Sequence, residues 1–88
     1  MPVVSLEIYV AQGCFTCNRS RALAKRIHER FRDVLVQVID LATERGEHHH
    51  LVTATPTFVL NGRIFSLGNP SEVELETAIA ALLNGEEP

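Results

Sequence analysis

Cys14 and Cys17 are the only cysteines of this 88-residue chain, and Phe15 and Thr16 separate them. The apolar run 3–10 before the pair predicts a strand, and residues 15–32 predict a helix that begins at the pair. A cysteine at a helix start lies beside unpaired backbone N–H groups, which favour an anion. This setting lowers a thiol's pKa, and the thiolate is the form that attacks disulfides and binds metals. The pair therefore indicates redox or metal chemistry.

The composition limits the classes of protein to which the chain can belong. Eighty-eight residues predict a single small domain over 1–88, and 45% hydrophobic with 22% charged residues is typical of a soluble globular protein. A net charge of −3 argues against nucleic acid as a partner, and no apolar run is long enough to cross a membrane. Residues 1–4 show no signal-peptide features, so we expect a cytoplasmic protein. In that reducing compartment a vicinal cysteine pair is more typical of chemistry than of a structural disulfide.

Hydrophobic patterns predict four strands, at residues 3–10, 34–41, 57–60 and 63–67, and helices at 15–32 and 71–83. The first strand, helix and second strand form a βαβ unit, so these two strands should be parallel. The nearly continuous apolar run 34–41 is typical of a strand buried on both faces, and residues 42–50 predict a short helix or a loop. The order β-α-β-α-β-β-α predicts an α/β fold with a four-stranded mixed sheet flanked by helices.

Local signals support these boundaries. Asn61-Gly62 between two apolar runs predicts a tight hairpin turn, because both residues accept positive φ. Ser71 followed by Glu74 predicts a helix N-cap with a capping box. Each helix also carries an apolar stripe, which the pattern assigns to Ser20, Leu23, Ala24, Ile27 and Phe31 in the first and to Val73, Leu75, Ala78, Ile79, Leu82 and Leu83 in the last.

This order of elements, with a Cys-x-x-Cys at the first strand–helix junction, resembles the thioredoxin and glutaredoxin superfamily. Thr55-Pro56-Thr57 looks like the family's cis-proline segment, which faces the active-site cysteines, and Gly68-Asn69-Pro70 stands where the family has a glycine-containing loop. Gly13-Cys14 and Arg19 look like a small glutaredoxin. The resemblance covers nearly the whole chain and implies a thioredoxin-like fold.

The chain departs from both subfamilies. Ala11 stands where glutaredoxins carry a lysine, and the loop that holds the glutathione carboxylate is reduced to residues 67–70. Ile8 stands where thioredoxins carry a buried aspartate, so no internal base is evident for deprotonating Cys17. The resemblance therefore implies a hybrid of glutaredoxin size without either subfamily's full set of helpers.

The resemblance implies a thiol-disulfide oxidoreductase that reduces protein disulfides by a dithiol mechanism. Cys14 would be the attacking nucleophile and Cys17 the resolving thiol, and the two would form the redox-active disulfide without a further cofactor or metal. The expected partners are a disulfide-containing protein and an electron donor, either a flavin-dependent reductase or glutathione, and the protein is expected to be a monomer. Substrate contacts are predicted at Phe15, Thr16, Arg19, Thr55, Pro56 and Gly68. Gly68 is also expected to allow close backbone approach near the site.

Two other functions remain open on the sequence. Cys14 and Cys17 could bind or deliver a metal, with a histidine from His48-His49-His50 as a further ligand. The same fold could also serve as a redox-sensitive binding module that turns over no substrate. A polar surface segment is the simpler interpretation of residues 48–50.

Overall fold

The structure is a computed structural model that describes residues 3–86; the first two and last two residues of the expected 1–88 domain lie outside the described part. Four strands form one mixed sheet in the order β2-β1-β3-β4 and two helices pack against it, which confirms the predicted fold class. Along the chain the elements are β1 Val4–Val10, α1 Cys17–Arg30, β2 Val34–Asp40, the one-turn 3₁₀ helix η1 His49–Leu51, β3 Thr57–Leu60, β4 Arg63–Leu67 and α2 Glu72–Leu83.

β1 lies in the interior of the sheet and pairs with a strand on each side. It runs parallel to β2, as the predicted βαβ unit requires, and antiparallel to β3. β3 in turn runs antiparallel to β4. Every residue of β1 except Ser5 is buried, so this strand is covered on both faces.

The prediction that residues 34–41 form a strand buried on both faces is wrong. β2 is an edge strand, and Leu35 is 53% exposed. Val36 and Val38 point toward the helices and pack against the core, whereas Leu35 lies on the face that no helix covers. A run of β-branched residues indicates that a strand forms. The order of the strands in the sheet decides which strand is central and buried on both faces.

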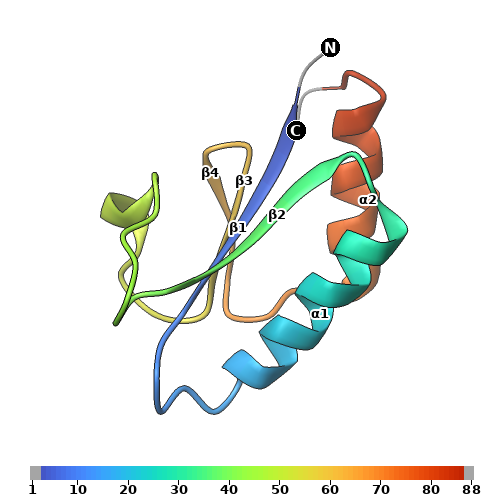
Figure 1. The fold of residues 1–88 in the computed structure, drawn as a ribbon. Coiled ribbons are helices and arrows are strands. Elements are labelled where there is room, and N and C mark those ends of the chain that lie inside the picture. The colour runs from blue at the N-terminus through green and yellow to red at the C-terminus, as the bar shows by residue number, and fades with distance from the viewer. Residues whose placement is uncertain (1–2, 87–88) are drawn as a thin grey trace.

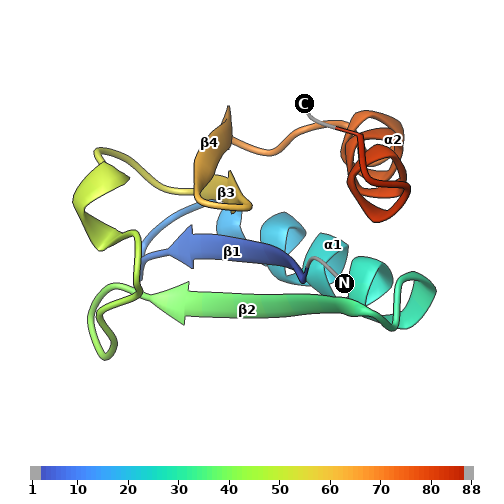
Figure 2. The same cartoon turned by 90° about the horizontal axis from the view of Figure 1, so that it is seen from above.

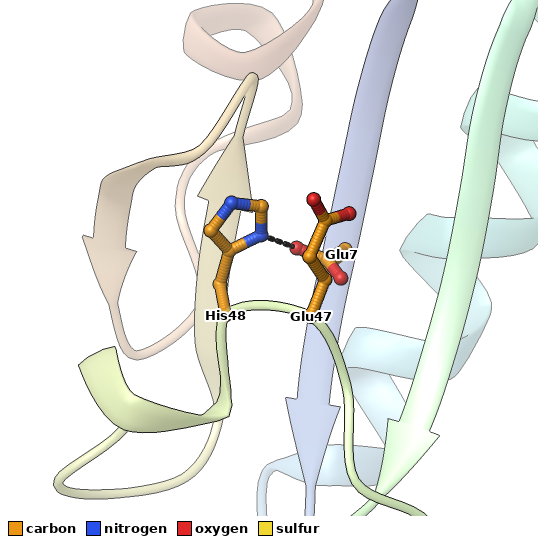
Figure 3. A group of neighbouring side chains, drawn as sticks. All are labelled: Glu7, Glu47 and His48. Atoms are coloured by element: carbon orange, nitrogen blue, oxygen red, sulfur yellow. Dashed lines mark hydrogen bonds and ion pairs between the residues drawn. The ribbon is translucent and has the colours of Figure 1, made fainter.

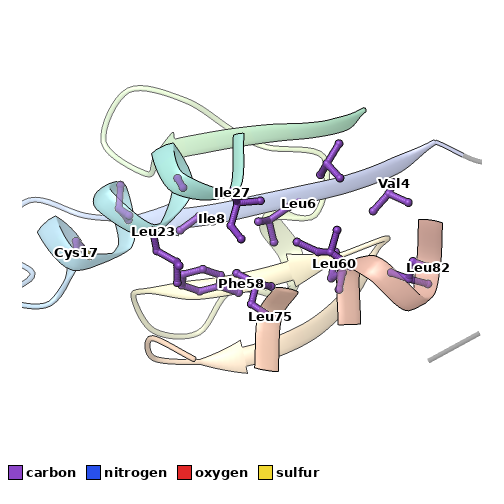
Figure 4. Close-up of a cluster of buried hydrophobic side chains, with 14 residues drawn as sticks. Val4, Leu6, Ile8, Cys17, Leu23, Ile27, Phe58, Leu60, Leu75 and Leu82 are labelled. Carbon is purple, nitrogen blue, oxygen red and sulfur yellow. The ribbon is translucent and has the colours of Figure 1, made fainter. Parts of the chain in front are cut away.

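The main core lies between the sheet and the two helices. Leu6 and Ile8 of β1 pack in one cluster with Ile27 of α1 and with Leu75 and Ile79 of α2 (Figure 4). Alternate residues of a strand point to opposite faces, so the even-numbered residues of β1 all serve this cluster. Both helices therefore cover the same face of the sheet.

The opposite face of the sheet is covered by the segment 41–52 rather than by a helix. A smaller apolar cluster forms there from Tyr9, Ile39 and Val59, with Leu51 and Val52 packed against it. Figures 1 and 2 show η1 on the other side of the sheet from α1 and α2. Helices were expected to flank the sheet. The structure has two α-helices on one face and a single 3₁₀ turn on the other.

The helices begin and end close to the predicted residues. α1 starts at Cys17 rather than at residue 15, and its buried stripe runs through Ser20 to Ile27 as predicted. α2 starts after Ser71, whose Oγ accepts a hydrogen bond from the backbone N–H of Glu74 at 3.1 Å. The predicted apolar stripe of α2 is wrong at both ends. Val73 is 74% exposed and Leu83 is 39% exposed, because both point away from the side of the helix that carries the buried Leu75, Ile79 and Leu82.

The predicted hairpin turn joins β3 to β4 and also holds β1. Asn61 and Gly62 have φ values of 49° and 80°, which confirms the positive φ expected at both positions. The Asn61 side-chain oxygen accepts a hydrogen bond from the Ser5 backbone N–H at 2.8 Å, and the Asn61 N–H donates to the Ser5 carbonyl at 2.9 Å. The turn residue therefore ties the hairpin to the start of the central strand.

We expect Asn61→Ala to lower the free energy of unfolding by about 1–2 kcal/mol, because alanine tolerates positive φ poorly and lacks the side-chain acceptor. Chemical denaturation measures this loss. Asn61→Asp, which keeps both the acceptor and the tolerance of positive φ, is the matched control and should lose less. Equal losses in the two variants would contradict this account of the turn.

Candidate active site

Three segments that are distant in sequence meet at one end of the sheet, where β1 ends and α1 begins (Figure 1). They are the loop 11–16, the residues before β3 and the loop before α2. Two hydrogen bonds link them: the Gly68 N–H donates to the Pro56 carbonyl at 2.8 Å, and the Asn69 side-chain amide donates to the Thr16 carbonyl at 2.9 Å. The structure thus brings the loop of the predicted cysteine pair together with the two other predicted segments.

A disulfide joins Cys14 and Cys17, with a Cα–Cα distance of 5.4 Å. Cys17 is the first residue of α1 and is buried in the main core, whereas Cys14 lies in the preceding loop and is only partly buried. The helix begins later than predicted, with Thr16 at its N-cap. Cys14 therefore precedes the helix, and its carbonyl accepts a hydrogen bond from the Cys17 N–H at 3.3 Å.

The side chains around the disulfide differ in exposure. Phe15 is 100% exposed, and the Thr16 hydroxyl lies 3.9 Å from the Cys14 sulfur. Arg19 is exposed on α1 and lines a cleft between α1 and the loop before α2, together with Arg26 and others. Within residues 3–86, Arg26 pairs with a carboxylate of α2, and Arg19 makes no ion pair.

Thr55 and Pro56 end the segment that leads into β3, and the peptide bond between them is cis. Pro56 is buried and Thr55 is partly exposed. Gly68 has a φ of 93°, which a side chain would strain, but a Cβ on it would meet no atom within 4 Å. Within this chain the backbone angle explains the glycine, and the expectation that Gly68 permits close backbone approach near the site stays a prediction.

Sequence reasoning missed two residues that hold this site together. Ser20 is completely buried, and its hydroxyl donates to the Asn69 side-chain oxygen at 2.5 Å. Asn69 in turn binds the Thr16 carbonyl at the start of α1. The available signal was a hydroxyl side chain within the otherwise apolar stripe of α1, since a buried hydroxyl needs a partner.

The residue that stands in place of the buried aspartate, Ile8, packs among apolar side chains. Ile8 is fully buried in the same cluster as Cys17. The neighbouring Glu7 does not replace that aspartate, because adjacent strand residues point to opposite faces. The Glu7 side chain, 5% exposed, lies on the other face, where His48 Nδ1 pairs with its carboxylate (Figure 3).

The three consecutive histidines do not join the cysteines. Within residues 3–86, the one group of three metal-ligating side chains consists of Glu7, Glu47 and His48, on the face of the sheet away from α1 (Figure 3). Tyr9 completes this cluster: its hydroxyl donates to Glu7 at 3.2 Å and accepts from the His48 backbone N–H at 2.9 Å. The buried carboxylate and its partners attach the segment 41–52 to β1.

Comparison with known proteins identifies the family. The profile of the thioredoxin domain matches residues 4–80 of this chain. The chain belongs to the thioredoxin domain family. No curated protein gives a significant match to the sequence. Within residues 3–86, no helix combines the length and apolar character needed to cross a bilayer.

Solved thioredoxin structures share the fold of this thioredoxin domain. Thioredoxin-2 of the malaria parasite, a component of its protein secretion machinery, superposes with a TM-score of 0.74 at 17% identity over 89% of this chain and 82% of that one. A mutant thioredoxin from Halobacterium salinarum NRC-1 gives a TM-score of 0.74 at 24% identity over 90% and 74% of the two chains. A designed protein gives 0.67 at 21% identity over 91% and 76%. These similarities establish the fold.

Burial raises the pKa of Tyr9 above its ordinary value of 10.0; the hydrogen bond from the His48 N–H opposes this, and the Glu7 charge adds to it. Tyr9 is the only tyrosine and the chain has no tryptophan, so ultraviolet titration of tyrosinate reports this residue alone. We expect a midpoint above 10.0 in the folded protein and near 10 in the unfolded protein.

The stability effect has a defined sign. The folded state favours the neutral form of Tyr9, so the raised pKa contributes to the free energy of unfolding. This contribution is fully present below pH 10, the ordinary value, and is lost as the pH rises through the pKa of Tyr9 in the folded state. Glu7→Gln should lower the titration midpoint of Tyr9 only partly, since burial is the main cause of the raised pKa. A midpoint at or below 10 in the folded protein would contradict the burial of Tyr9.

Proposed function

We propose that this thioredoxin-family protein is a thiol-disulfide oxidoreductase that reduces protein disulfides by a dithiol mechanism. The observation that carries the proposal is the unequal burial of the Cys14–Cys17 disulfide at the start of α1. Cys17 lies within the core and Cys14 is the more accessible sulfur, beside the fully exposed Phe15. An incoming nucleophile or substrate disulfide therefore reaches Cys14 first.

The reaction begins from the reduced pair. The Cys14 thiolate attacks one sulfur of the substrate disulfide, forming a mixed disulfide and releasing the other substrate sulfur as a thiolate. Cys17 then loses its proton to solvent or to that thiolate and attacks the Cys14 sulfur. The second substrate sulfur leaves, and the Cys14–Cys17 disulfide remains. Two electrons have passed from the protein to the substrate.

The surroundings of Cys14 suggest how a protein substrate is held. We assign the Thr55 backbone and Pro56 to pairing with an extended substrate segment, and Gly68 to the loop beside it. Phe15 offers an apolar contact because its ring is completely exposed. Arg19 is available to an anionic group, since within residues 3–86 it has no acidic partner.

An electron donor must regenerate the reduced pair. Ala11 and the short loop at residues 67–70 lack the side chains that hold glutathione in glutaredoxins, which favours a flavin-dependent reductase as the donor. A reducing compartment such as the cytoplasm, and a monomeric protein, fit this function. The metal-binding alternative is less well supported, because no described histidine or carboxylate forms a ligand group with Cys14 and Cys17.

We expect Cys17→Ser to accumulate stable mixed disulfides with substrate proteins, because the resolving thiol is missing while Cys14 still attacks. Non-reducing electrophoresis with mass spectrometry identifies the trapped proteins. Cys14→Ser is the matched control and should trap little, since the remaining cysteine is buried. Reduction of insulin by the wild-type protein is the activity measurement. Stoichiometric zinc in the purified protein, with no trapping and no reductase activity, would favour the metal-binding alternative instead.

We expect the resolution step to slow in acid, because Ile8 provides no base for Cys17 and only the thiolate attacks. Below the pKa of a thiol its thiolate fraction falls by about tenfold per pH unit, so the rate constant of this step should fall steeply between about pH 8 and 5. Stopped-flow release of a thiol from a preformed mixed disulfide on Cys14 measures this step. A rate constant independent of pH over that range would show that a base in the protein takes the proton.

A further inference from the structure

The carbonyl oxygen of Thr16 is the most heavily used acceptor near the disulfide. It accepts the backbone N–H groups of Arg19 at 3.1 Å and Ser20 at 3.2 Å, as expected at a helix start. It also accepts the Asn69 side-chain amide at 2.9 Å, from a loop 53 residues further along the chain. The Asn69 bond is the shortest of the three.

Ser20 fixes the orientation of the Asn69 side chain. Its hydroxyl has one hydrogen and two acceptors within reach, the Asn69 oxygen at 2.5 Å and the Thr16 carbonyl at 3.3 Å, and the nearer one takes the hydrogen. Rotating the Asn69 amide by half a turn would place its oxygen against the Thr16 carbonyl oxygen. The amide nitrogen must therefore face Thr16. Ser20 is completely buried, and its hydrogen bond to Asn69 is partly buried, whereas the Asn69–Thr16 bond is exposed.

The Thr16 carbonyl belongs to the same peptide unit as the Cys17 N–H. A hydrogen bond to a peptide oxygen polarises the unit and makes its N–H a stronger donor. In the disulfide form this N–H donates to the Cys14 carbonyl at 3.3 Å, which is at the long end for such a bond. The Cys14 sulfur is bonded to the sulfur of Cys17, so the thiolate that Cys14 gains when the disulfide opens would form near the Cys17 N–H. A stronger donor there favours the negative charge.

We propose that Asn69, oriented by Ser20, is a positioning residue that stabilises the reduced form of the Cys14–Cys17 pair. Stabilising the reduced form makes the pair a stronger oxidant. The inference rests on the proposed redox function for its significance, but it concerns the equilibrium between two forms of this chain. It can therefore be tested without catalytic turnover.

A purely structural role for Asn69 makes a different prediction. If the residue only attaches the loop before α2 to α1, its loss destabilises the oxidised and reduced proteins equally and leaves the reduction potential unchanged. If it acts on the thiolate, its loss destabilises the reduced protein more. The difference between the two losses equals the change in the potential, because the four states form a thermodynamic cycle.

The experiment equilibrates each variant with glutathione redox buffers. We expect Asn69→Ala to shift the equilibrium about threefold toward the disulfide, which is about 14 mV for a two-electron couple. Asn69→Asp keeps the acceptor for Ser20 but turns an oxygen toward Thr16, and should shift the equilibrium at least as far toward the disulfide.

Ser20→Ala leaves Asn69 in place and should give a smaller shift of the same sign, which also tests the inference if Asn69→Ala does not fold. Asn18→Ala, an exposed asparagine on the same helical turn, is the matched control and should give no shift.

A second measurement separates failure of the inference from failure of the proposed function. Denaturant unfolding of the oxidised and reduced forms gives the two stability losses directly. Equal losses in both forms, with an unchanged potential, would overturn the role of Asn69 and leave the oxidoreductase intact. A wild-type pair that reduces no protein substrate would overturn the proposed function, whereas unequal losses in Asn69→Ala would still support this inference.

Discussion

The structure depends on the complete burial of its central strand. β1 makes backbone ladders with β2 and β3, and the loop that carries Cys14 follows directly from its last residue. Because its side chains alternate between two covered faces, the strand has one possible register. A shift by one residue would place Glu7 in the core beneath Cys17 and Ile8 among polar groups. The strand thereby fixes both the position of the cysteine loop and the surroundings of each sulfur.

The two sulfurs owe their different accessibility to this arrangement. Cys17 begins α1 and contributes to the core under the helix, so it moves only if the helix moves. Cys14 lies in a loop held by its disulfide and by the first turn of the helix. Asn69 and Ser20 attach that turn to the loop before α2, and the Gly68–Pro56 bond attaches that loop to the segment entering β3. The site is therefore rigid on the protein side and open on the side of Phe15.

The other face of the sheet has a separate role. Glu7 is a buried carboxylate at the centre of an apolar strand, and such a group is tolerated only with partners. His48 and Tyr9 supply them, and through them the segment 41–52 covers a face that has no α-helix. His48 of the histidine run therefore helps to hold the fold together at a place away from the cysteines. This polar cluster also explains why a residue adjacent to Ile8 can be acidic without serving as a base for Cys17.

The sequence by itself determined the features that short-range physics controls. Alternation and periodicity predicted the strands and helices, the positive-φ requirement predicted the turn at Asn61-Gly62, and capping predicted the start of α2 at Ser71. The cysteine pair before a predicted helix indicated redox or metal chemistry, and the disulfide was implied by the resemblance to a known family. The same resemblance predicted the fold.

The tertiary structure decided what depends on distant segments. Only the order of strands shows that β2 is an edge, because an apolar run looks alike at the edge and in the centre of a sheet. Only the packed structure pairs Glu7 with His48 and Ser20 with Asn69, since hydrogen bonds between residues 41 and 49 positions apart leave no periodic signal. The cysteine pair could thus be found from the sequence, whereas the groups that hold it required the fold.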